Sequence, residues 1–350
     1  MEEGDGMNAR RTIVRLIFVG VDISADINKH LLSLTYTDNE EDKTDDLQLS
    51  LDDREGVWLG NWLNTPSASK GAEISAVIVQ KNWDSTGKDR VLDCGVFEVD
   101  TVNGSGPPAK ATIKAGSIPY SSTIRTQKKT KAWEKITLSA LANEIAGTNG
   151  LTCMFESAFD PFYTRKEQMQ ESDITFLQRL CKNAGISLKV TAKMIVLFDA
   201  AAYEQKDAVR TIKRGAADVS RWSFSTSLHD VSYSSCHVSY TDPTTATTIE
   251  YTYTPRDADE SGQVLEINEK VSSREEARQL AMKRLRQKNK EEFKASFSLA
   301  GDARLAAGIT VLVSGYGAFD GKYIIETATH SVSRSGYKTD ITLRRALEGY

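Results

Sequence analysis

The sequence predicts a mostly β protein of the α+β class, in which two tube-like β-barrel domains flank a central helix-helix-hairpin insert. Apolar and polar residues alternate from about 12 to 115 and again from about 219 to 345, whereas the segment between them has helical spacing. The predicted organisation is a disordered leader at 1–10, a first barrel at 11–120, an insert at 121–215, and a second barrel at 216–350 with an inserted helix at about 273–292.

The composition sets limits on the class of protein. A chain of 350 residues can bury a sizeable core without help from a disulfide or a metal. Its longest apolar runs are too short to cross a bilayer, and no signal core follows Met1, so we expect no membrane span. A net charge of −4 gives no global attraction for nucleic acid. Four separated cysteines without a CxxC pair indicate reduced, mostly buried thiols: Cys94, Cys153, Cys181 and Cys236.

The first β region begins with a strand at 12–19, which mixes β-branched and aromatic residues. Leu47, Leu49 and Leu51 alternate with polar residues, as in a half-exposed strand. A hairpin tip is expected at 84–89, where turn-forming residues gather. Further strands are predicted at 32–37, 74–82, 91–102 and 111–115.

The middle of the chain changes to a helical period. A first helix is expected from Leu138 to Ile145, followed by Gly147. A clearer helix starts at Ser172 and ends at Gly185, with an apolar face that includes Phe176 and Leu180. Two short apolar runs after it predict a small hairpin at 186–190 and 194–198.

The second β region contains one strong helix, because Ser273 and Glu276 form a capping box before an apolar stripe. The two β regions have similar length and content, which suggests a duplication, although no residue-level repeat is visible. Strands are predicted at 221–225, 231–240, 247–253, 293–299, 310–313, 322–332 and 337–343.

Two groups of residues are candidate interface residues. The first is an acidic loop, which the general behaviour of charge runs predicts to be a solvated hairpin tip. The second is a tryptophan pair that could anchor an interface or lie in the core. The candidates are Asp38, Glu40, Glu41, Asp42, Asp45 and Asp46 in the loop, and Trp58 and Trp62 in the pair.

No catalytic, cofactor-binding or metal site is predicted. The segment 257–268 opens like a calcium loop but has Asn268 where a bidentate Glu is needed, so a polar hairpin loop is the preferred interpretation. The four histidines are scattered and lack an HExxH partner. Asp52 and Asp53 are adjacent on a strand and point to opposite faces, which does not suit a shared glycosidic site. The basic face of the helix after Ser273 is better explained as a solvated surface than as a nucleic-acid contact.

Several sequence blocks carry a resemblance to a known family. They run from Cys94 through Asp100, at Gly106-Pro107-Pro108, at Ile118-Pro119, from Ile124 through Glu134, from Tyr163 through Gln168 and from Glu171 through Leu180. In these blocks the chain resembles the phage late control D family of tail baseplate hub proteins, which is related to the hub part of type VI secretion spike proteins. The resemblance spans about Arg11 to Arg345.

The resemblance implies a structural protein that acts in a ring of three copies. Two tube-like barrels per copy would make a pseudo-sixfold collar, which adapts a hexameric tail tube to a trimeric spike. The acidic loop at 38–46 would then lie at a ring face or towards the channel, with the solvated hairpin tip as the alternative. The expected partners are the tail tube protein, a separate spike protein, and baseplate wedge and tape-measure proteins, with DNA only in passage through the lumen. The protein would be assembled in the bacterial host cytoplasm and then reside in the baseplate of a virion or phage-tail-like particle.

Two other function classes stay open at this stage. The insert, from Thr130 to Ala201, could be a module that binds peptidoglycan. A tail component that hydrolyses the cell wall is the other alternative, although no catalytic residues support it.

Overall fold

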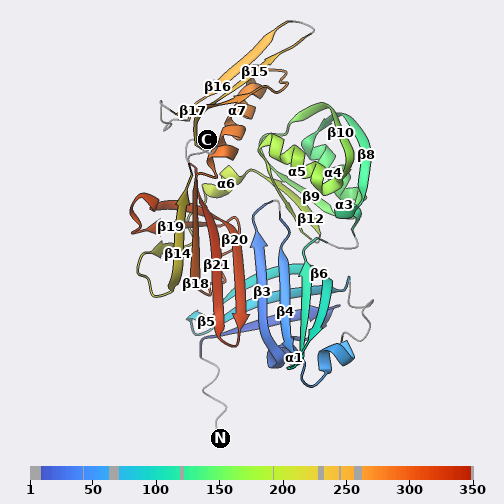
Figure 1. Cartoon of the computed structure of the whole chain (residues 1–350), viewed down its shortest axis with the longest axis vertical. Helices are drawn as coiled ribbons and strands as arrows, with labels where there is room; N and C mark the ends of the chain where they lie inside the picture. The colour runs from blue at the N-terminus through green and yellow to red at the C-terminus, as the bar shows by residue number, and fades with distance from the viewer. Residues whose placement is uncertain are drawn as a thin grey trace.

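The computed structural model describes residues 9–41, 43–62, 71–118, 122–191, 193–227, 232–243, 246–255 and 262–347, and for residues 61 and 62 it describes the backbone alone. The protein is mostly β (Figure 1). A long sheet crosses the molecule, and the helical insert and a smaller sheet with its own helix both lie beyond one end of its strands.

The first β region follows the predicted strands closely. Leu47, Leu49 and Leu51 are buried on one side of their strand, while Gln48 on the other side is exposed. Its elements are β1 (Arg11–Phe18), β2 (Val21–Asp22), α1 (Ser24–His30), β3 (Leu31–Asn39), β4 (Asp46–Asp52), the π-helix η1 (Trp58–Trp62), β5 (Glu73–Ser85), β6 (Lys88–Ser105) and β7 (Lys110–Gly116).

The insert contains the predicted helices and hairpin. The Ser172 hydroxyl accepts a hydrogen bond from the Thr175 N–H and starts the second helix, and Gly185 ends it at φ +64°. A two-stranded antiparallel ribbon of β8 and β10 was not expected from the sequence. The elements are α3 (Thr123–Thr126), β8 (Lys128–Thr137), α4 (Leu138–Thr148), β9 (Thr152–Glu156), β10 (Phe162–Ser172), α5 (Asp173–Ala184), β11 (Ser187–Val190), β12 (Met194–Phe198) and α6 (Ala200–Glu204).

The second β region is divided between two sheets. The strands β15, β16 and β17 pair only with one another among the described residues and pack on α7 with a separate apolar core. The elements are β13 (Thr211–Lys213), β14 (Val219–Thr226), β15 (Tyr233–Thr241), β16 (Thr248–Tyr253), β17 (Gln263–Ile267), α7 (Arg274–Asn289), β18 (Phe293–Ala300), β19 (Thr310–Ser314), the 3₁₀ turn η2 (Gly317–Phe319), β20 (Gly321–Ser333) and β21 (Gly336–Arg345).

The long sheet contains the same strand arrangement twice. In the first β region the hydrogen-bonded order is β3-β4-β7-β6-β5-β1, and in the second it is β14-β18-β21-β20-β19-β13. Take the first four strands of each sheet order and number them by their position in the chain. In both regions the sheet order is then first, second, fourth and third. The duplication suggested by the similar lengths is therefore visible in the topology.

The two arrangements are joined into one sheet, because β20 pairs with β3 in antiparallel register from Thr327↔Asn39 to Ser333↔Ser33. This pairing corrects the expectation of two closed barrels. The edge of β3 that could have closed the first barrel is used for the second region, and α1 packs against β1 and β4 instead. Within the described residues, each β region is a curved, open sheet.

The turn between β1 and β2 holds a strained residue. Val19 has φ +48° and Gly20 has φ +77°. A β-branched residue is rare in the left-handed region because its side chain crowds the backbone there. The Val19 side chain is 60% exposed, so packing in the isolated chain does not account for the strain.

Replacing Val19 with Asn should stabilise the folded protein, because Asn tolerates a left-handed backbone. We expect the free energy of unfolding to rise by about 1 kcal/mol in denaturant titrations. Val21→Asn is the matched control, since Val21 is similarly exposed but is not among the residues with positive φ. An equal effect of both substitutions would contradict this explanation.

Candidate functional site, a buried ionic junction

A cluster of buried charges lies where the first β region, the insert and the second β region meet. Its centre is Arg344 near the end of β21, which is fully buried. Glu40 reaches it from the loop after β3, and Glu204 reaches it from α6 at the end of the insert. We call this cluster, together with its neighbours Glu41, Lys290, Arg286, Asp38, Asp45 and Lys189, the ionic junction.

The guanidinium of Arg344 binds two carboxylates at once. Its Nη2 donates to Glu40 Oε1 at 2.9 Å, and its Nη1 donates to Glu204 Oε1. Arg286 of α7 also contacts Glu204, with 2.5 Å between Nη2 and Oε1. The second oxygen of Glu204 accepts the Leu347 N–H at 2.9 Å. A forked arginine between two acids thus ties three separate parts of the chain together.

A second group of ion pairs joins the same acidic loop to the hairpin of the insert. Lys189 Nζ on β11 lies 2.6 Å from Asp38 Oδ1 and 3.2 Å from Asp45 Oδ2. The other oxygen of Asp38 accepts the Ala307 N–H at 2.8 Å, so this side chain also contacts the second β region. Glu41 is paired with Lys290, just after α7.

Burial and the neighbouring opposite charges shift the pKa values of this cluster in opposite directions. Burial, the largest influence, raises the pKa of Asp45 to about 6, although the Lys189 ammonium acts in the opposite direction. Burial alone would also raise the pKa of Glu204, but Arg344 and Arg286 hold that pKa below its usual value. For Arg344, burial favours the neutral form, yet Glu40 and Glu204 raise its pKa above the usual value.

The ionic junction matters because the apolar core of the insert does not continue into the sheet. That core contains only residues between 118 and 197, and the core beneath β15–β17 contains only residues between 236 and 285. Further polar contacts complete the attachment, such as the pair of Lys283 on α7 with Asp199 at 3.1 Å. The position of the insert on the sheet is therefore set largely by hydrogen-bonded charges.

The acidic loop does not behave as a solvated hairpin tip. Asp38, Glu40 and Asp45 are buried, because each has a partner distant in sequence. Asp42 lies outside the described residues. Asp46 is exposed at the start of β4. Whether this loop contacts another subunit or a channel stays a prediction.

The structure tests the prediction for Trp58 but not the one for Trp62. Trp58 is buried in the core of the first β region, with its ring 5.9 Å from that of His30 in an edge-to-face contact. The side chain of Trp62 lies outside the described residues. The core alternative therefore holds for Trp58.

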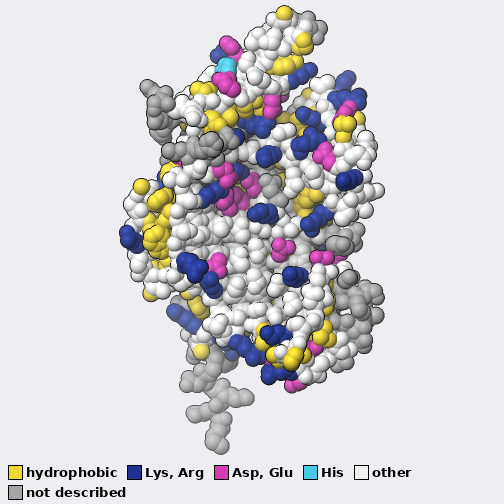
Figure 2. Space-filling model, viewed as in Figure 1, with side chains coloured by type: hydrophobic (Ala, Val, Ile, Leu, Met, Phe, Trp, Pro, Cys, Tyr) yellow, Lys and Arg dark blue, Asp and Glu magenta, His cyan; other side chains and the backbone are white. Residues whose placement is uncertain are grey.

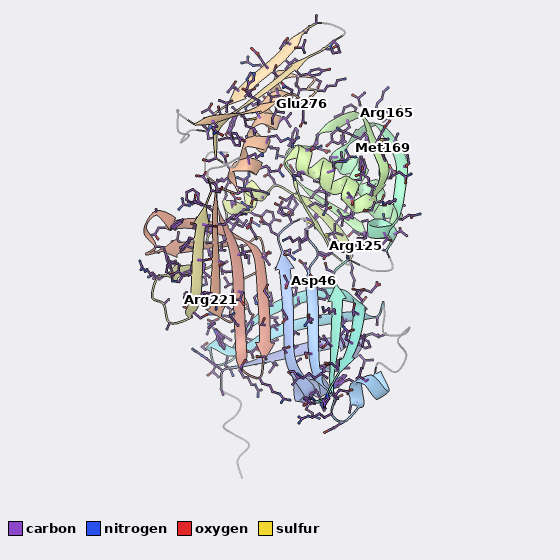
Figure 3. All side chains as sticks on the ribbon, in the orientation of Figure 1. Asp46, Arg125, Arg165, Met169, Arg221 and Glu276 are labelled. Atoms are coloured by element: carbon purple, nitrogen blue, oxygen red, sulfur yellow. The ribbon has the colours of Figure 1, made fainter. Side chains whose placement is uncertain are left out.

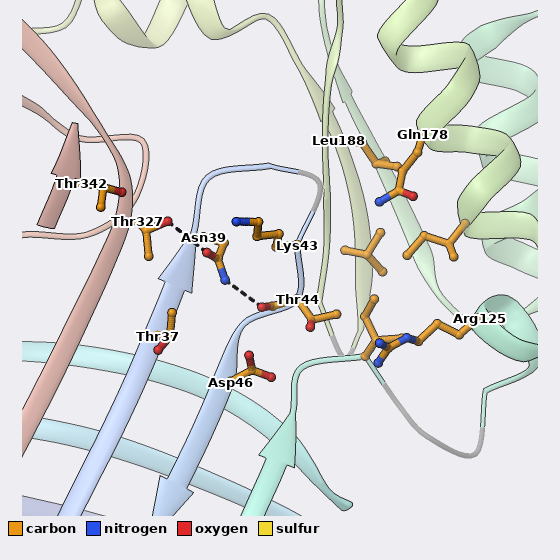
Figure 4. A pocket seen from close by; sticks show the side chains of 13 residues that line it. Thr37, Asn39, Lys43, Thr44, Asp46, Arg125, Gln178, Leu188, Thr327 and Thr342 are labelled. Atoms are coloured by element: carbon orange, nitrogen blue, oxygen red, sulfur yellow. Dashed lines mark hydrogen bonds between the residues drawn. The ribbon is translucent and has the colours of Figure 1, made fainter. Parts of the chain in front are cut away.

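A groove lies beside the ionic junction, between the sheet and the insert, and has a volume of about 760 Å³ (Figure 4). Its floor includes Thr37, Thr327 and Thr342 from three neighbouring strands. Asn39 bridges this floor, because its amide donates to the Thr44 carbonyl and its oxygen accepts from the Thr327 hydroxyl. Asp46 and Arg125 both line the groove, as Figures 3 and 4 show.

The histidines that the structure describes make contacts within the fold. His330 is buried between Tyr337 and the Leu305 carbonyl, and burial lowers its pKa. His237 is paired with Thr252 on a strand surface, and His229 lies outside the described residues. The start of the segment 257–268 lies outside them too. Among described residues, no His, Cys, Asp and Glu side chains cluster in a way that could hold a metal ion.

The cysteines are free thiols, and three of the four are buried. Burial raises the pKa of Cys236 to about 12, which makes its thiolate scarce. None of the helices in the described part of the chain is both long enough and apolar enough to span a bilayer.

This fold is the fold of known tail proteins. The chain aligns over 95% of its length with 96% of a tail protein from Neisseria meningitidis MC58, with a TM-score of 0.67 at 11% identity. It also aligns over 92% of its length with 75% of an Escherichia coli protein described as a component of the type VI secretion system, with a TM-score of 0.59 at 13% identity. At such low identity these similarities concern the fold alone.

The sequence comparisons give the family. Residues 83–336 match the model of the phage tail baseplate hub (GPD) family, so the chain belongs to that family. A probable baseplate hub protein of Escherichia phage 186 is 28% identical over 180 residues, which is 51% of this chain. The matched segment spans only 43% of that relative.

Replacing Arg344 with Met should strongly destabilise the protein, because Glu40 would keep its buried charge without its partner. We expect a loss of about 3–5 kcal/mol in the free energy of unfolding, measured by denaturant titration. Arg54→Met is the control: it removes an arginine whose side chain is 66% exposed, and it should change stability little. Equal effects of the two substitutions would show that the ionic junction is not important for stability.

The stability of Asp45→Asn relative to the wild type should depend on pH. The folded-state pKa of about 6 lies above the ordinary value of 3.8, so between these values the native protein holds a proton that the unfolded chain has lost. The wild type therefore loses stability as pH rises through this range, whereas Asn cannot titrate. Between about pH 3.5 and 7 the variant should gain on the order of 2–3 kcal/mol relative to the wild type. A difference that is constant with pH would contradict the assignment to Asp45.

Proposed function

We propose that this protein is a structural hub of a tail baseplate, and that three copies form a ring which connects a sixfold tail tube to a threefold spike. The family supports the hub role. The observation that carries the ring is the repeated strand arrangement, in which each chain supplies four strands of each β region to one row.

Eight described strands form this row, in the order β14-β18-β21-β20-β3-β4-β7-β6 (Figure 1). Every neighbouring pair in it is antiparallel. Because the number is even, placing β14 of one copy beside β6 of the next continues the alternation. The row can therefore extend from copy to copy without a change in its hydrogen-bonding pattern.

The two ends of the row are free to pair. Among described residues, β14 pairs only with β18. The last part of β6, from Thr101 to Ser105, pairs with β7 on one side. On its other side, the backbone hydrogen bonds among described residues end at Val99, which bonds to Gly71 and Ala72. Exposed strand edges of this kind are templates for pairing with another chain.

The junction inside each chain has the same form as the proposed junction between chains. Within the chain, β20 pairs with β3, which joins the third strand of one repeat to the first strand of the other. Between chains, β6 and β14 are again a third and a first strand. Three copies would thus present six near-equivalent units joined by six similar contacts, a closed ring of heterologous interfaces.

An exposed apolar side chain accompanies the proposed contact. Trp222 on the edge strand β14 is 47% exposed, with its ring 5.2 Å from that of Tyr316. An exposed aromatic side chain on an unpaired edge strand suits a contact with a neighbouring copy.

The further partners follow from the hub role. A tail tube protein would meet one face of the ring and a separate spike protein the other, with wedge and tape-measure proteins nearby. The protein would assemble in the host cytoplasm and then remain in the baseplate of the particle. The ring itself needs no catalytic group, which agrees with a role outside enzymology.

The ring is tested by the mass of the purified chain, alone and with its spike protein. Native mass spectrometry should give three times the chain mass of 38.6 kDa in at least one of these conditions. Trp222→Glu should weaken the trimer about tenfold or more, because it places a charge in a buried contact. Phe162→Glu is the control, since Phe162 is an exposed aromatic on the insert. A monomer under both conditions would overturn the proposal.

A further inference from the structure

An aromatic group on the edge strand β14 is left partly uncovered. The ring of Trp222 lies 5.7 Å from that of Phe224, which stacks on Phe319 at 4.7 Å. The hydroxyl of Tyr316, in the same group, is buried and has no hydrogen-bond partner among the described residues, although buried hydroxyls normally have one. Figure 2 shows hydrophobic side chains gathered over β14 and β19, at the left edge of the molecule. The surroundings of this group are therefore incomplete in a single chain.

Both repeats carry the same irregularity in their third strand, which allows them to be aligned residue by residue. β6 has a bulge just after Val99, which pairs with Ala115 of β7. β20 has a bulge just after Ile325, which pairs with Leu343 of β21. Because a bulge adds one residue at a defined place in a strand pair, the two bulges mark equivalent positions.

The cross-strand register carries this alignment to the first strand of each repeat. In the first repeat the neighbours are Ala115, Leu47 and Tyr36, and in the second they are Leu343, Ala295 and Phe224. Phe224 on β14 therefore holds the place that Tyr36 holds on β3. Two residues earlier in each strand, Trp222 holds the place of Leu34.

The two equivalent places differ in what covers them. Leu34 is fully buried, and Tyr36 is stacked on His330 with 6.0 Å between the ring centroids, because β20 lies along the outer edge of β3. Trp222 is half-exposed, because no described strand pairs with the outer edge of β14. In the ring, β6 of the next copy would take the place that β20 has inside the chain.

The register of the β20–β3 junction can be carried over to the junction between copies. The β20 residues that stand opposite Tyr36 and Leu34 are His330 and Val332. The residues of the first repeat at the same distance from the bulge are Gly104 and Gly106. Gly104 would thus stand opposite Phe224, and Gly106 opposite Trp222.

We infer that β6 of one copy pairs with β14 of the next in this register, and that the turn Gly106-Pro107-Pro108 covers Trp222. This inference rests on the proposed ring and adds to it the register and the side-chain contact that determine it. The neighbours across the contact are Val102 with Thr226, Asn103 with Ser225, Gly104 with Phe224, Ser105 with Ser223, and Gly106 with Trp222.

The turn has the chemistry that this position requires. Pro107 and Pro108 have no N–H to donate to β14, so the strand pairing ends beside Trp222. Both prolines are exposed in the single chain. Proline segments dock readily on aromatic side chains, and proline loses little side-chain entropy when it is ordered. The contact gives a role to a sequence block that the hub function alone leaves unexplained.

The register is tested with a disulfide between copies. Ser105→Cys/Ser223→Cys places one thiol at each end of the row, so only two copies can bring them together. Opposite residues of an antiparallel pair have Cα atoms about 4.5–5.5 Å apart, which suits a disulfide. Ser105→Cys/Ser225→Cys is the matched control, because Ser225 lies on the same side of β14 but is a diagonal neighbour at about 7–8 Å.

Under mild oxidation, the Ser105→Cys/Ser223→Cys protein should form disulfide-linked trimers about tenfold faster than the control, as measured on non-reducing gels. The wild type, in which three of the four thiols are buried, gives the background. Equal rates, a faster control, or no linked trimer from either protein would overturn the register if native mass spectrometry still shows a trimer. A monomer in native mass spectrometry would instead remove the ring, and the inference with it.

The contact of the turn with Trp222 is tested separately by a double-mutant cycle. Pro107→Ser/Pro108→Ser should raise the dissociation constant of the trimer about tenfold in the wild type but much less in Trp222→Ala, since the prolines then have no ring to cover. Pro108→Ser alone is the milder variant if the double change prevents folding. Equal weakening in both backgrounds, or none in the wild type, shows that the turn does not cover Trp222.

Discussion

The pairing of β20 with β3 is the constraint on which the rest of the structure depends. Without it, the two β regions would be separate sheets, joined only by side-chain contacts such as the pair of Arg344 with Glu40. With it, they become one sheet, and the antiparallel rule decides the direction of every strand in the row. At about 4.8 Å between strands, each four-strand unit occupies about 19 Å of the row, so equal units follow at equal spacing. A near-sixfold arrangement requires this regularity.

Local sequence patterns predicted the elements well but not their partners. Alternation located β3, β4 and β7 because it reports which side of a strand is buried, and the hydroxyl of Ser172 with Gly185 located the ends of α5. Alternation does not report which edge pairs with which. This explains why two closed barrels were expected where an open shared sheet exists, and why the strands predicted at 231–240 and 247–253 were placed in the second barrel although they form a separate sheet.

The two-stranded ribbon of β8 and β10 shows a different limit. Most of its side chains are exposed or half-exposed, as Figure 3 shows for Arg165 and Met169, and only a few, such as Trp133 and Gln168, are buried. A ribbon that places so few apolar residues against its helices has no clear period for the sequence to reveal. The ionic junction is hidden for another reason, because the partners Arg344 and Glu40 are 304 residues apart in the chain.

The acidic loop also explains how the insert can be attached firmly with little shared apolar core. Buried ion pairs add little stability compared with well-packed apolar groups, since both charges lose water, but they tolerate few geometries. A forked guanidinium between Glu40 and Glu204 is satisfied only when the loop, α6 and β21 are all in place. In a ring, every copy must hold its insert at the same angle at the same end of the row, or the partners beyond that end would meet unequal surfaces. Directional charges supply this orientation where non-directional apolar contacts would allow sliding, so the burial of the acidic loop would serve the symmetry of the proposed ring.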